Sequence, residues 1–232
     1  MKGKTWTTLD VIWALLAIMG GIFLVQSLQL SGAAGTSVVV WNAIYLAAVY
    51  LFLLIVVIVF TVVKYGSILA DLGFRRFKFL KTLGLVVVWW LAVRAVILLY
   101  SFIATTVASG FGVKPPSELT NRVPEVFGPG IMGFLLAFVV AVIIGPVIEE
   151  VFFRGFLYPA FKRRLGIVAG VIISSFIFGL FHVNPWLVFP TAIMGAAMAL
   201  LYEKEGSLWT PILFHSLNNL VSVVLVYTLF GK

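Results

Sequence analysis

Two adjacent carboxylates, Glu149 and Glu150, stand in the stretch GPVIEEVFFRG at 145–155, and Arg154 follows them closely. The preceding residues are apolar, so charges here are costly and indicate a functional role. On a helix, Glu150 and Arg154 stand at i and i+4 with the acid first, the favourable order for an ion pair. Glu149 is turned about 100° away from that face. We therefore predict a structural Glu150–Arg154 pair and a separate Glu149, which acts either as a general base or as a partner for Arg94 or a loop cation.

The chain contains two histidines, and both lie within apolar runs. In FGLFH at 178–182, Phe178 precedes His182 by one helical turn, and in HSLNN at 215–219, His215 and Asn219 share one face. Two hydrogen-bond donors aimed the same way suit a developing oxyanion. The alternative is that the histidines are satisfied core residues and that the second pair holds helices together. The other polar residues inside these runs are Arg94 and Asn218.

The composition is that of a membrane protein, because 62% of the 232 residues are hydrophobic and only 10% are charged, whereas soluble domains carry roughly 25% charged residues. Unbroken runs such as LFLLIVVIVF at 51–60 argue against a β-barrel, whose strands alternate in polarity. We predict an all-α polytopic bundle of about seven transmembrane helices with an intramembrane polar cavity. The predicted spans are 9–31, 38–63, 83–109, 130–158, 167–182, 187–202 and 208–229.

These spans are predicted to form one membrane domain over 1–232, with N-terminal spans in 1–129 and the catalytic helices in 130–229. A cleaved signal peptide within the first 31 residues is the alternative for the first span. Its apolar run is too long for a typical signal sequence, so an uncleaved span is preferred.

The net charge of +8 arises from basic residues gathered in particular loops. This distribution indicates membrane orientation rather than nucleic-acid binding, with a cytoplasmic N-terminus in an integral, multi-pass protein of the cell membrane. With seven spans, the C-terminus lies outside. The basic loops can also contact anionic lipid. The residues concerned are Lys2, Lys4, Lys64, Arg75, Arg76, Lys78, Lys81, Lys162, Arg163 and Arg164.

The predicted spans also give the depth of each polar residue below the cytoplasmic surface. At 1.5 Å per residue, Glu149 lies ~16 Å deep, His215 ~12 Å and His182 ~24 Å. The first two depths agree. His182 is too deep for a straight helix, so the span 167–182 is expected to tilt or to start later if the site is to close.

The three motifs EEVFFR at 149–154, FGLFH at 178–182 and HSLNN at 215–219 resemble those of the CAAX prenyl protease and bacteriocin-processing (CPBP) family of intramembrane proteases. The resemblance covers about 145–220, with the motifs in the family's order. It implies peptide-bond hydrolysis within the membrane, with water activated by Glu149 and His182 and the oxyanion held by His215 and Asn219. Glu150 and Arg154 would support the helix.

The chemistry available to the chain is limited by its lack of cysteine, which excludes a cysteine nucleophile and thiolate metal ligands. The family has also been labelled metalloprotease, and Glu149, His182 and His215 offer a His₂Glu zinc set. No HExxH sequence is present, however, and a ligand role for Glu149 would require Glu150 as the base. No cofactor is therefore required in the preferred mechanism, with zinc as the alternative.

The expected partners are the bilayer and a membrane-bound peptide or lipidated protein, such as a prenylated CAAX-type substrate.

Two other functions use the same polar residues. One is a non-catalytic self-immunity factor or scaffold, and the other, less favoured, is a transporter or proton relay. No matched pair of broken helices in two halves supports transport.

Overall fold

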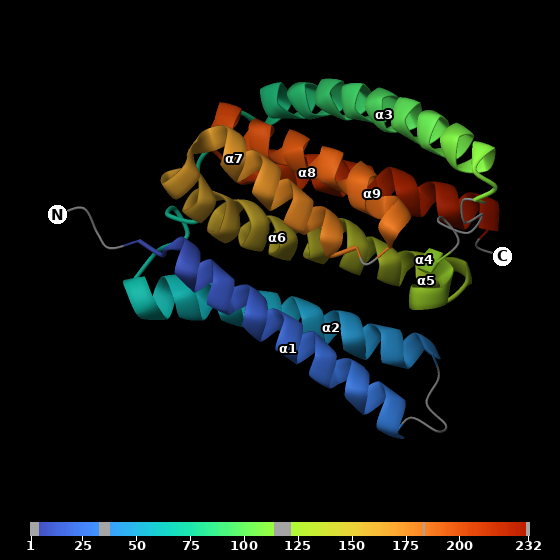
Figure 1. Ribbon diagram of the computed structural model, residues 1–232, viewed down its shortest axis with the longest axis horizontal. Coiled ribbons are helices and arrows are strands. Elements are labelled where there is room, and N and C mark those ends of the chain that lie inside the picture. The colour runs from blue at the N-terminus through green and yellow to red at the C-terminus, as the bar shows by residue number, and fades with distance from the viewer. Residues whose placement is uncertain (1–4, 33–37, 114–121, 183, 231–232) are drawn as a thin grey trace.

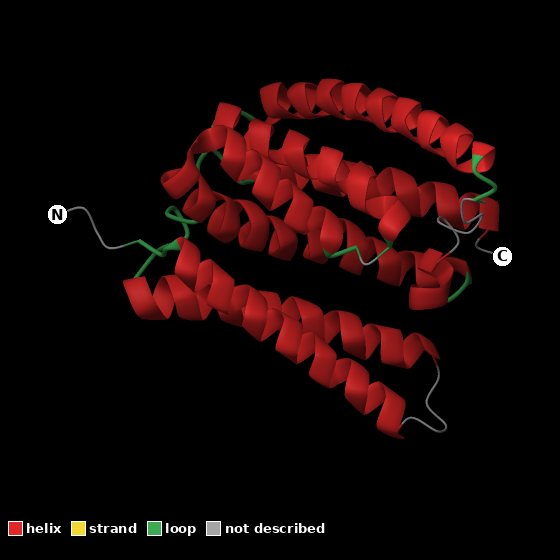
Figure 2. Ribbon diagram, in the orientation of Figure 1, coloured by secondary structure: helices red, strands yellow, loops and turns green. Residues whose placement is uncertain are grey.

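The computed structural model describes residues 5–32, 38–113, 122–182 and 184–230, and in these residues the secondary structure is helical, without strands (Figure 2). Six helical stretches are long and apolar enough to cross a membrane. The chain is thus an all-α, multi-pass membrane protein, as its composition predicts. The α-helices are α1 (Thr8–Gly32), α2 (Val38–Val57), α3 (Phe79–Gly110), α4 (Arg122–Phe127), α5 (Gly130–Ala137), α6 (Gly145–Glu150), α7 (Tyr158–Leu180), α8 (Pro185–Glu205) and α9 (Trp209–Phe230). Wider π-helical turns are η1 (Ile58–Val63), η2 (Phe138–Ile144) and η3 (Val151–Leu157).

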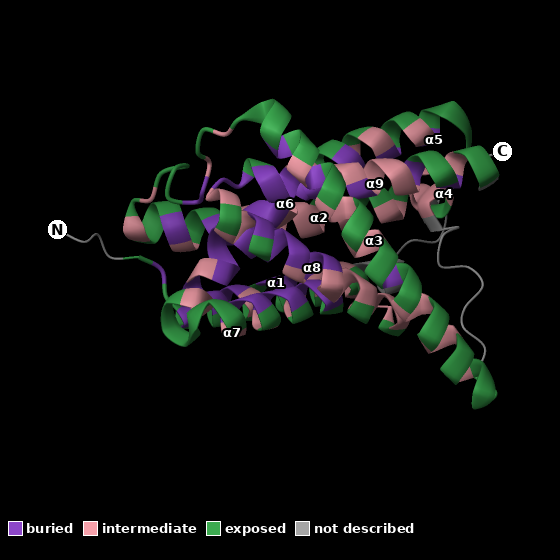
Figure 3. Cartoon of the chain, turned by 90° about the horizontal axis from the view of Figure 1, so that it is seen from above, coloured by how far each residue is buried: buried purple, intermediate pink, exposed green. Residues whose placement is uncertain are grey.

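The helices pack around a central segment that runs from α5 through η2, α6 and η3 into α7. The α1–α2 pair lies on one side of it, and α3 covers α8 and α9 on the other (Figure 1). Four apolar residues of η3 are almost wholly buried: Phe152, Phe153, Phe156 and Leu157. Seen from above, buried residues gather along α6 and α8, while outward faces of the surrounding helices are exposed (Figure 3). The core of the bundle therefore surrounds the stretch that carries the two glutamates.

A helical hairpin accounts for the longest apolar stretch, Gly130–Leu180, which has 51 residues. At Gly166 the backbone leaves the helical region, with φ 84° and ψ 173°, and the chain turns back along itself (Figure 1). A positive φ of this size is readily adopted only by glycine. The predicted spans 130–158 and 167–182 correspond to the two arms, so the single long stretch crosses the bundle twice.

The first arm is longer than the sequence predicts, because helix continues beyond 158 to the residue before Gly166. The basic run Lys162–Arg164, which resembles a loop in sequence, occupies the last turns of this arm. Glu149 lies 17 residues before Gly166 and His182 lies 16 residues after it. At 1.5 Å per residue, both lie ~25 Å from the reversal. The different depths that the sequence predicts for Glu149 and His182 were therefore wrong, because the first arm ends near Gly166 and not at residue 158.

Asp10, in the first turn of α1, holds together the start of α1 and the end of the second span. The residue is 3% exposed. Asp10 accepts hydrogen bonds from the backbone N–H of Thr7 at 2.7 Å and the hydroxyl of Tyr65 at 2.8 Å. The Lys64 ammonium lies 2.5 Å from the same carboxylate. This hydrogen bond raises the pKa of Lys64, which follows η1 directly. The start of α1 is thus fastened to the end of the second span.

We expect Asp10→Ala to lower the thermal unfolding midpoint of the purified protein in detergent, because four donors, including the Thr7 hydroxyl, lose one buried acceptor. Glu205→Ala is the matched control. Its carboxylate lies 3.9 Å from the exposed Lys81 ammonium, and such surface pairs contribute little. Equal shifts in the two variants would contradict a structural role for the Asp10 contacts.

Candidate active site

The carboxylate of Glu150 and the guanidinium of Arg154 form the ion pair that their spacing predicts. Arg154 Nη1 lies 2.9 Å from Glu150 Oε1, and both side chains are 0% exposed. Arg154 Nη2 also donates to the carbonyl of Gly195 on α8 at 2.9 Å. Its guanidinium carbon lies 4.7 Å from the centre of the Phe178 ring. The pair therefore connects η3 to both α8 and the second arm of the hairpin.

Glu150 has a second contact that the sequence did not indicate, because its Oε1 lies 3.0 Å from Nδ1 of His215. Because the Glu150 oxygen already accepts from Arg154, we assign the hydrogen to this nitrogen, which donates it to the carboxylate. In neutral His215, the other nitrogen, Nε2, then has a free lone pair. That nitrogen lies 3.9 Å from Glu149 Oε2. Glu150 therefore orients His215 toward Glu149, in addition to neutralising Arg154.

The carboxylate of Glu149 faces a cavity of about 680 Å³ and is 22% exposed. The hydroxyl of Tyr50, on α2, donates to Glu149 Oε1 at 3.3 Å. His182 lines the same cavity, whose remaining wall is mostly apolar. Tyr50 belongs to none of the three sequence motifs, although a hydroxyl inside an apolar span is a signal for such a contact. The lining residues are Leu15, Met19, Ile22, Gln26, Tyr45, Leu46, Val49, Tyr50, Leu53, Glu149, Phe153, Ile177, Leu180, Phe181 and His182.

His182 lies in the turn that follows α7. Its Nδ1 is 3.0 Å from the carbonyl oxygen of Phe178. A carbonyl can only accept, so Nδ1 is the protonated nitrogen in the neutral ring and Nε2 has the free lone pair. The Phe178 ring packs edge-on against both histidines, with centroid distances of 5.0 Å to His182 and 5.7 Å to His215. Phe178 thus separates and fixes the two imidazoles.

Asn219 lies one turn after His215, and its Nδ2 donates to the carbonyl of Ala141 in η2 at 2.8 Å. The reason lies in the helix register. In η2 the N–H of Gly145 bonds to the carbonyl of Val140, five residues earlier. The same register pairs Ala141 with residue 146, which is a proline and has no N–H. The Asn219 amide therefore supplies the missing donor, and its second N–H is left for another acceptor.

A series of hydrogen-bonded polar side chains also extends from α3 to this region, and it lies outside the site that the sequence predicts. The Arg94 guanidinium donates to Asn218 Oδ1, and Asn218 Nδ2 donates to Asn219 Oδ1 at 3.2 Å. Arg94 also lies over the Trp90 ring, 5.5 Å from its centre. The signal was present, because a half-buried arginine in an apolar span is costly without a partner. Arg94 is therefore connected to Asn219 through Asn218, and it is not the partner of Glu149.

The proposed zinc ligands do not form a ready metal site. Throughout the described ranges, no group of three or more His, Cys, Asp or Glu side chains is arranged so that it could hold a metal ion. Glu149, His182 and His215 share one region, and both imidazoles present an Nε2 lone pair, yet they do not converge on a common ligand position.

The site as a whole combines a partly exposed carboxylate, two oriented imidazoles and an apolar cavity. Of the predicted residues, Glu149 and His182 line the cavity, and His215 lies beside Glu149. Asn219 is absent from the cavity lining and contacts η2 instead. This arrangement can hold a water molecule between acceptors at the edge of an apolar space, which is the requirement for hydrolysis inside a membrane.

Comparison with known proteins confirms the family resemblance carried by the three motifs. Residues 131–221 match the family of type II CAAX prenyl endopeptidases described as Rce1-like. The chain is 29% identical over 145 residues to the "Putative membrane peptidase YdiL" of Bacillus subtilis (strain 168). That alignment covers 62% of this chain and 58% of the relative. No solved structure gave a significant match. Both matches are to peptidases, so they support the predicted enzyme class, a hydrolase.

The two adjacent carboxylates are expected to differ when each is removed. Glu150→Ala leaves Arg154 buried without its counter-charge, and breaking such a pair costs about 3–5 kcal/mol. Glu149→Ala removes a partly exposed side chain held by one hydrogen bond. We expect Glu150→Ala to lower the yield and thermal unfolding midpoint of the folded protein strongly, and Glu149→Ala to change them little.

The measurement is the monodisperse fraction in size-exclusion chromatography together with a melting curve for each variant. If Glu149→Ala proved the more destabilising, the division between a structural and a functional carboxylate would be wrong.

Proposed function

We propose that this protein is an intramembrane endopeptidase that hydrolyses a peptide bond of a membrane-associated substrate. The observation that carries the proposal is the position of Glu149. Its carboxylate opens into a mostly apolar cavity of about 680 Å³ that His182 also lines, while Nε2 of His215 lies 3.9 Å away. The match to a family of prenyl endopeptidases supports the same reaction.

In the proposed reaction, Glu149 is the general base. Its carboxylate removes a proton from a water molecule as the water oxygen attacks the carbonyl carbon of the scissile bond. Nε2 of His182 accepts a hydrogen bond from the second O–H of that water and so orients it, and this hydrogen stays on the water oxygen. The proton on Glu149 then passes to the leaving nitrogen as the C–N bond breaks, which gives a carboxylic acid and an amine. A general base in this position contributes about 10²–10⁴ to the rate.

The developing oxyanion is assigned to His215 and Asn219. Donation to the oxyanion requires the imidazolium form of His215, in which the neutral ring described above has taken up a proton at Nε2 while Nδ1 still donates to Glu150. Asn219 uses one amide hydrogen for the carbonyl of Ala141 and can donate the other. Asn218 and Arg94 position the Asn219 side chain through the hydrogen bonds described above. Removal of one such donor typically costs about 10²–10³ in rate.

The cavity wall indicates the class of substrate. Residues of α1, α2 and α7 supply most of it, and they are predominantly aliphatic or aromatic. Such a wall favours an apolar segment or a lipid chain over a charged peptide. We propose a membrane-tethered peptide as substrate, and a prenylated CAAX-type C-terminus satisfies that requirement.

The proposed orientation of the protein in the membrane rests on the position of its basic residues. Lys64, the loop with Arg75 and Arg76, and the run Lys162–Arg164 belong to one end of the bundle. We propose that this end is cytoplasmic, together with the N-terminus, in the cell membrane.

Glu149→Gln is expected to retain the fold and lose turnover by about 10²–10⁴, because the amide keeps the shape of the side chain but cannot take the proton. The measurement is comparative mass spectrometry of membrane peptides from cells that produce the native chain or the variant. Glu205→Gln is the control for loss of a carboxylate away from the cavity. A Glu149→Gln protein that yields the same cleaved peptides as the native chain would exclude the proposed base and leave a non-catalytic role.

Exhaustive chelation is expected to leave activity unchanged, because Glu149, His182 and His215 are not arranged to share a metal ion. The purified protein should then contain well under one equivalent of zinc by elemental mass spectrometry. If a metal is needed, stoichiometric zinc should return with activity after chelation, and His182→Ala and His215→Ala should each lower bound zinc. That outcome would reassign these residues as ligands.

A further inference from the structure

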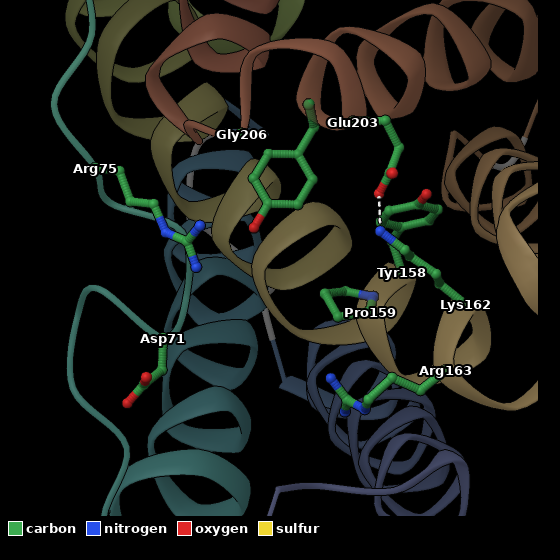
Figure 4. Close-up of a pocket in the computed structure, with 9 residues that line it drawn as sticks. Asp71, Arg75, Tyr158, Pro159, Lys162, Arg163, Glu203 and Gly206 are labelled. Carbon is green, nitrogen blue, oxygen red and sulfur yellow. Dashed lines mark hydrogen bonds and ion pairs between the residues drawn. The ribbon is translucent and has the colours of Figure 1, made fainter.

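A second pocket lies at the end of the bundle that carries the basic residues, far along the hairpin from Glu149. It has a volume of about 280 Å³ and is formed by the loop before α3, the first turns of α7 and the end of α8. Three cationic side chains line it, namely Arg75, Lys162 and Arg163. In Figure 4 the guanidinium groups of Arg75 and Arg163 extend toward the space between them. The reaction proposed above uses none of these residues.

The two carboxylates of the pocket do not neutralise it. Glu203 is paired with Lys162, whose ammonium lies 2.5 Å from Glu203 Oε1 (Figure 4). Asp71 accepts the backbone N–H of Ile68 at 2.8 Å, and its carboxylate is turned away from the pocket (Figure 4). The guanidinium of Arg75 has no hydrogen bond or ion pair among the residues that the structure describes. The pocket therefore has one positive charge more than it has negative charges.

The backbone that carries Arg75 is fixed in place. Its carbonyl accepts the hydroxyl of Ser207 at 2.8 Å, and the carbonyl of Gly73 accepts the N–H of Leu208 at 2.8 Å. Gly73 has φ 100°, so the turn that brings this loop against α8 suits glycine. Because the backbone at Arg75 is already fixed, ligand binding costs little additional backbone conformational entropy there.

The other guanidinium is also held so that part of it stays available. Nη2 of Arg163 donates to the carbonyl of Trp6 at 2.6 Å, and the group lies 5.1 Å from the centre of the Trp6 ring. A guanidinium has five N–H donors, so one such bond leaves several for a ligand. Tyr158 also lines the pocket, beside Glu203.

We propose that this pocket binds a phosphoryl group, with its oxygens accepting hydrogen bonds from Arg75 and Arg163. Arginine pairs with phosphate through two parallel N–H···O bonds, which are stronger than neutral hydrogen bonds. The pocket is at the end of the membrane-spanning helices, the level at which lipid headgroups lie. The phosphoryl group can belong to an anionic lipid or to free phosphate, and the ligand is independent of the peptide substrate.

Arg75→Gln tests this site, and Arg76→Gln is its matched control. The two arginines are adjacent in one loop and both are exposed, but only Arg75 lines the pocket. Because the Arg75 guanidinium has no described partner to lose, the variant should fold, and its melting curve checks this. The full chain in detergent is titrated with phosphatidylglycerol and the bound lipid is counted by native mass spectrometry.

We expect saturable binding of one lipid, with Kd raised about tenfold or more in Arg75→Gln and about twofold or less in Arg76→Gln. A competition with inorganic phosphate identifies the source. Displacement of the lipid shows that the phosphoryl group alone is recognised, and retention shows that the lipid headgroup is the ligand. Equal weakening in both variants, or the absence of saturable binding of either probe, would overturn the proposal. The readout does not depend on peptidase activity.

Discussion

The buried ion pair between Glu150 and Arg154 is the interaction on which the rest of the site depends. Two charges removed from water lose their hydration, and hydrogen bonds to other groups offset part of that cost. Arg154 Nη2 gains such a bond at the carbonyl of Gly195 on α8, and Glu150 Oε1 gains one from His215 on α9. Glu150 Oε2 and Arg154 Nε have no hydrogen-bond partner among the described residues. The requirement to satisfy one pair therefore brings three helical segments into register. Glu149, the next residue, is placed at the cavity as a result.

Missing backbone donors shape the site in a similar way. Pro146 leaves the carbonyl of Ala141 without an N–H, and Asn219 fills that vacancy from α9. The wide turns η2 and η3 flank the short helix α6, so the two glutamates sit between two irregular stretches. π-Helical turns are frequent at functional sites because they shift side chains relative to a regular helix. Here η2 is joined to α9 through Asn219, and η3 is joined to α8 through Arg154, so the glutamates are held from both ends.

The sequence predicted the helical class, the contact between Glu150 and Arg154 and the region where the histidines gather. These follow from local quantities: the length of apolar runs, i,i+4 spacing and the cost of charge in hydrocarbon. It did not predict the length of the hairpin arms, because the charges at 162–164 resemble a loop until their partners on α8 and the N-terminal segment are known. The contacts of Tyr50 and Asn219 depend on helices far apart in sequence, and no local pattern identifies them.

The wall of the larger cavity bears on how the proposed substrate would reach Glu149. Met19 on α1 and Leu180 on α7 line this cavity while 63% and 49% of their surfaces remain exposed. Because the outer faces of these helices meet lipid, the cavity is open sideways to the bilayer. The membrane-tethered substrate proposed above would then arrive by diffusion in two dimensions, and its supply would be set by its surface density. The natural unit of KM for such a reaction is mole fraction in the membrane rather than molar concentration in water.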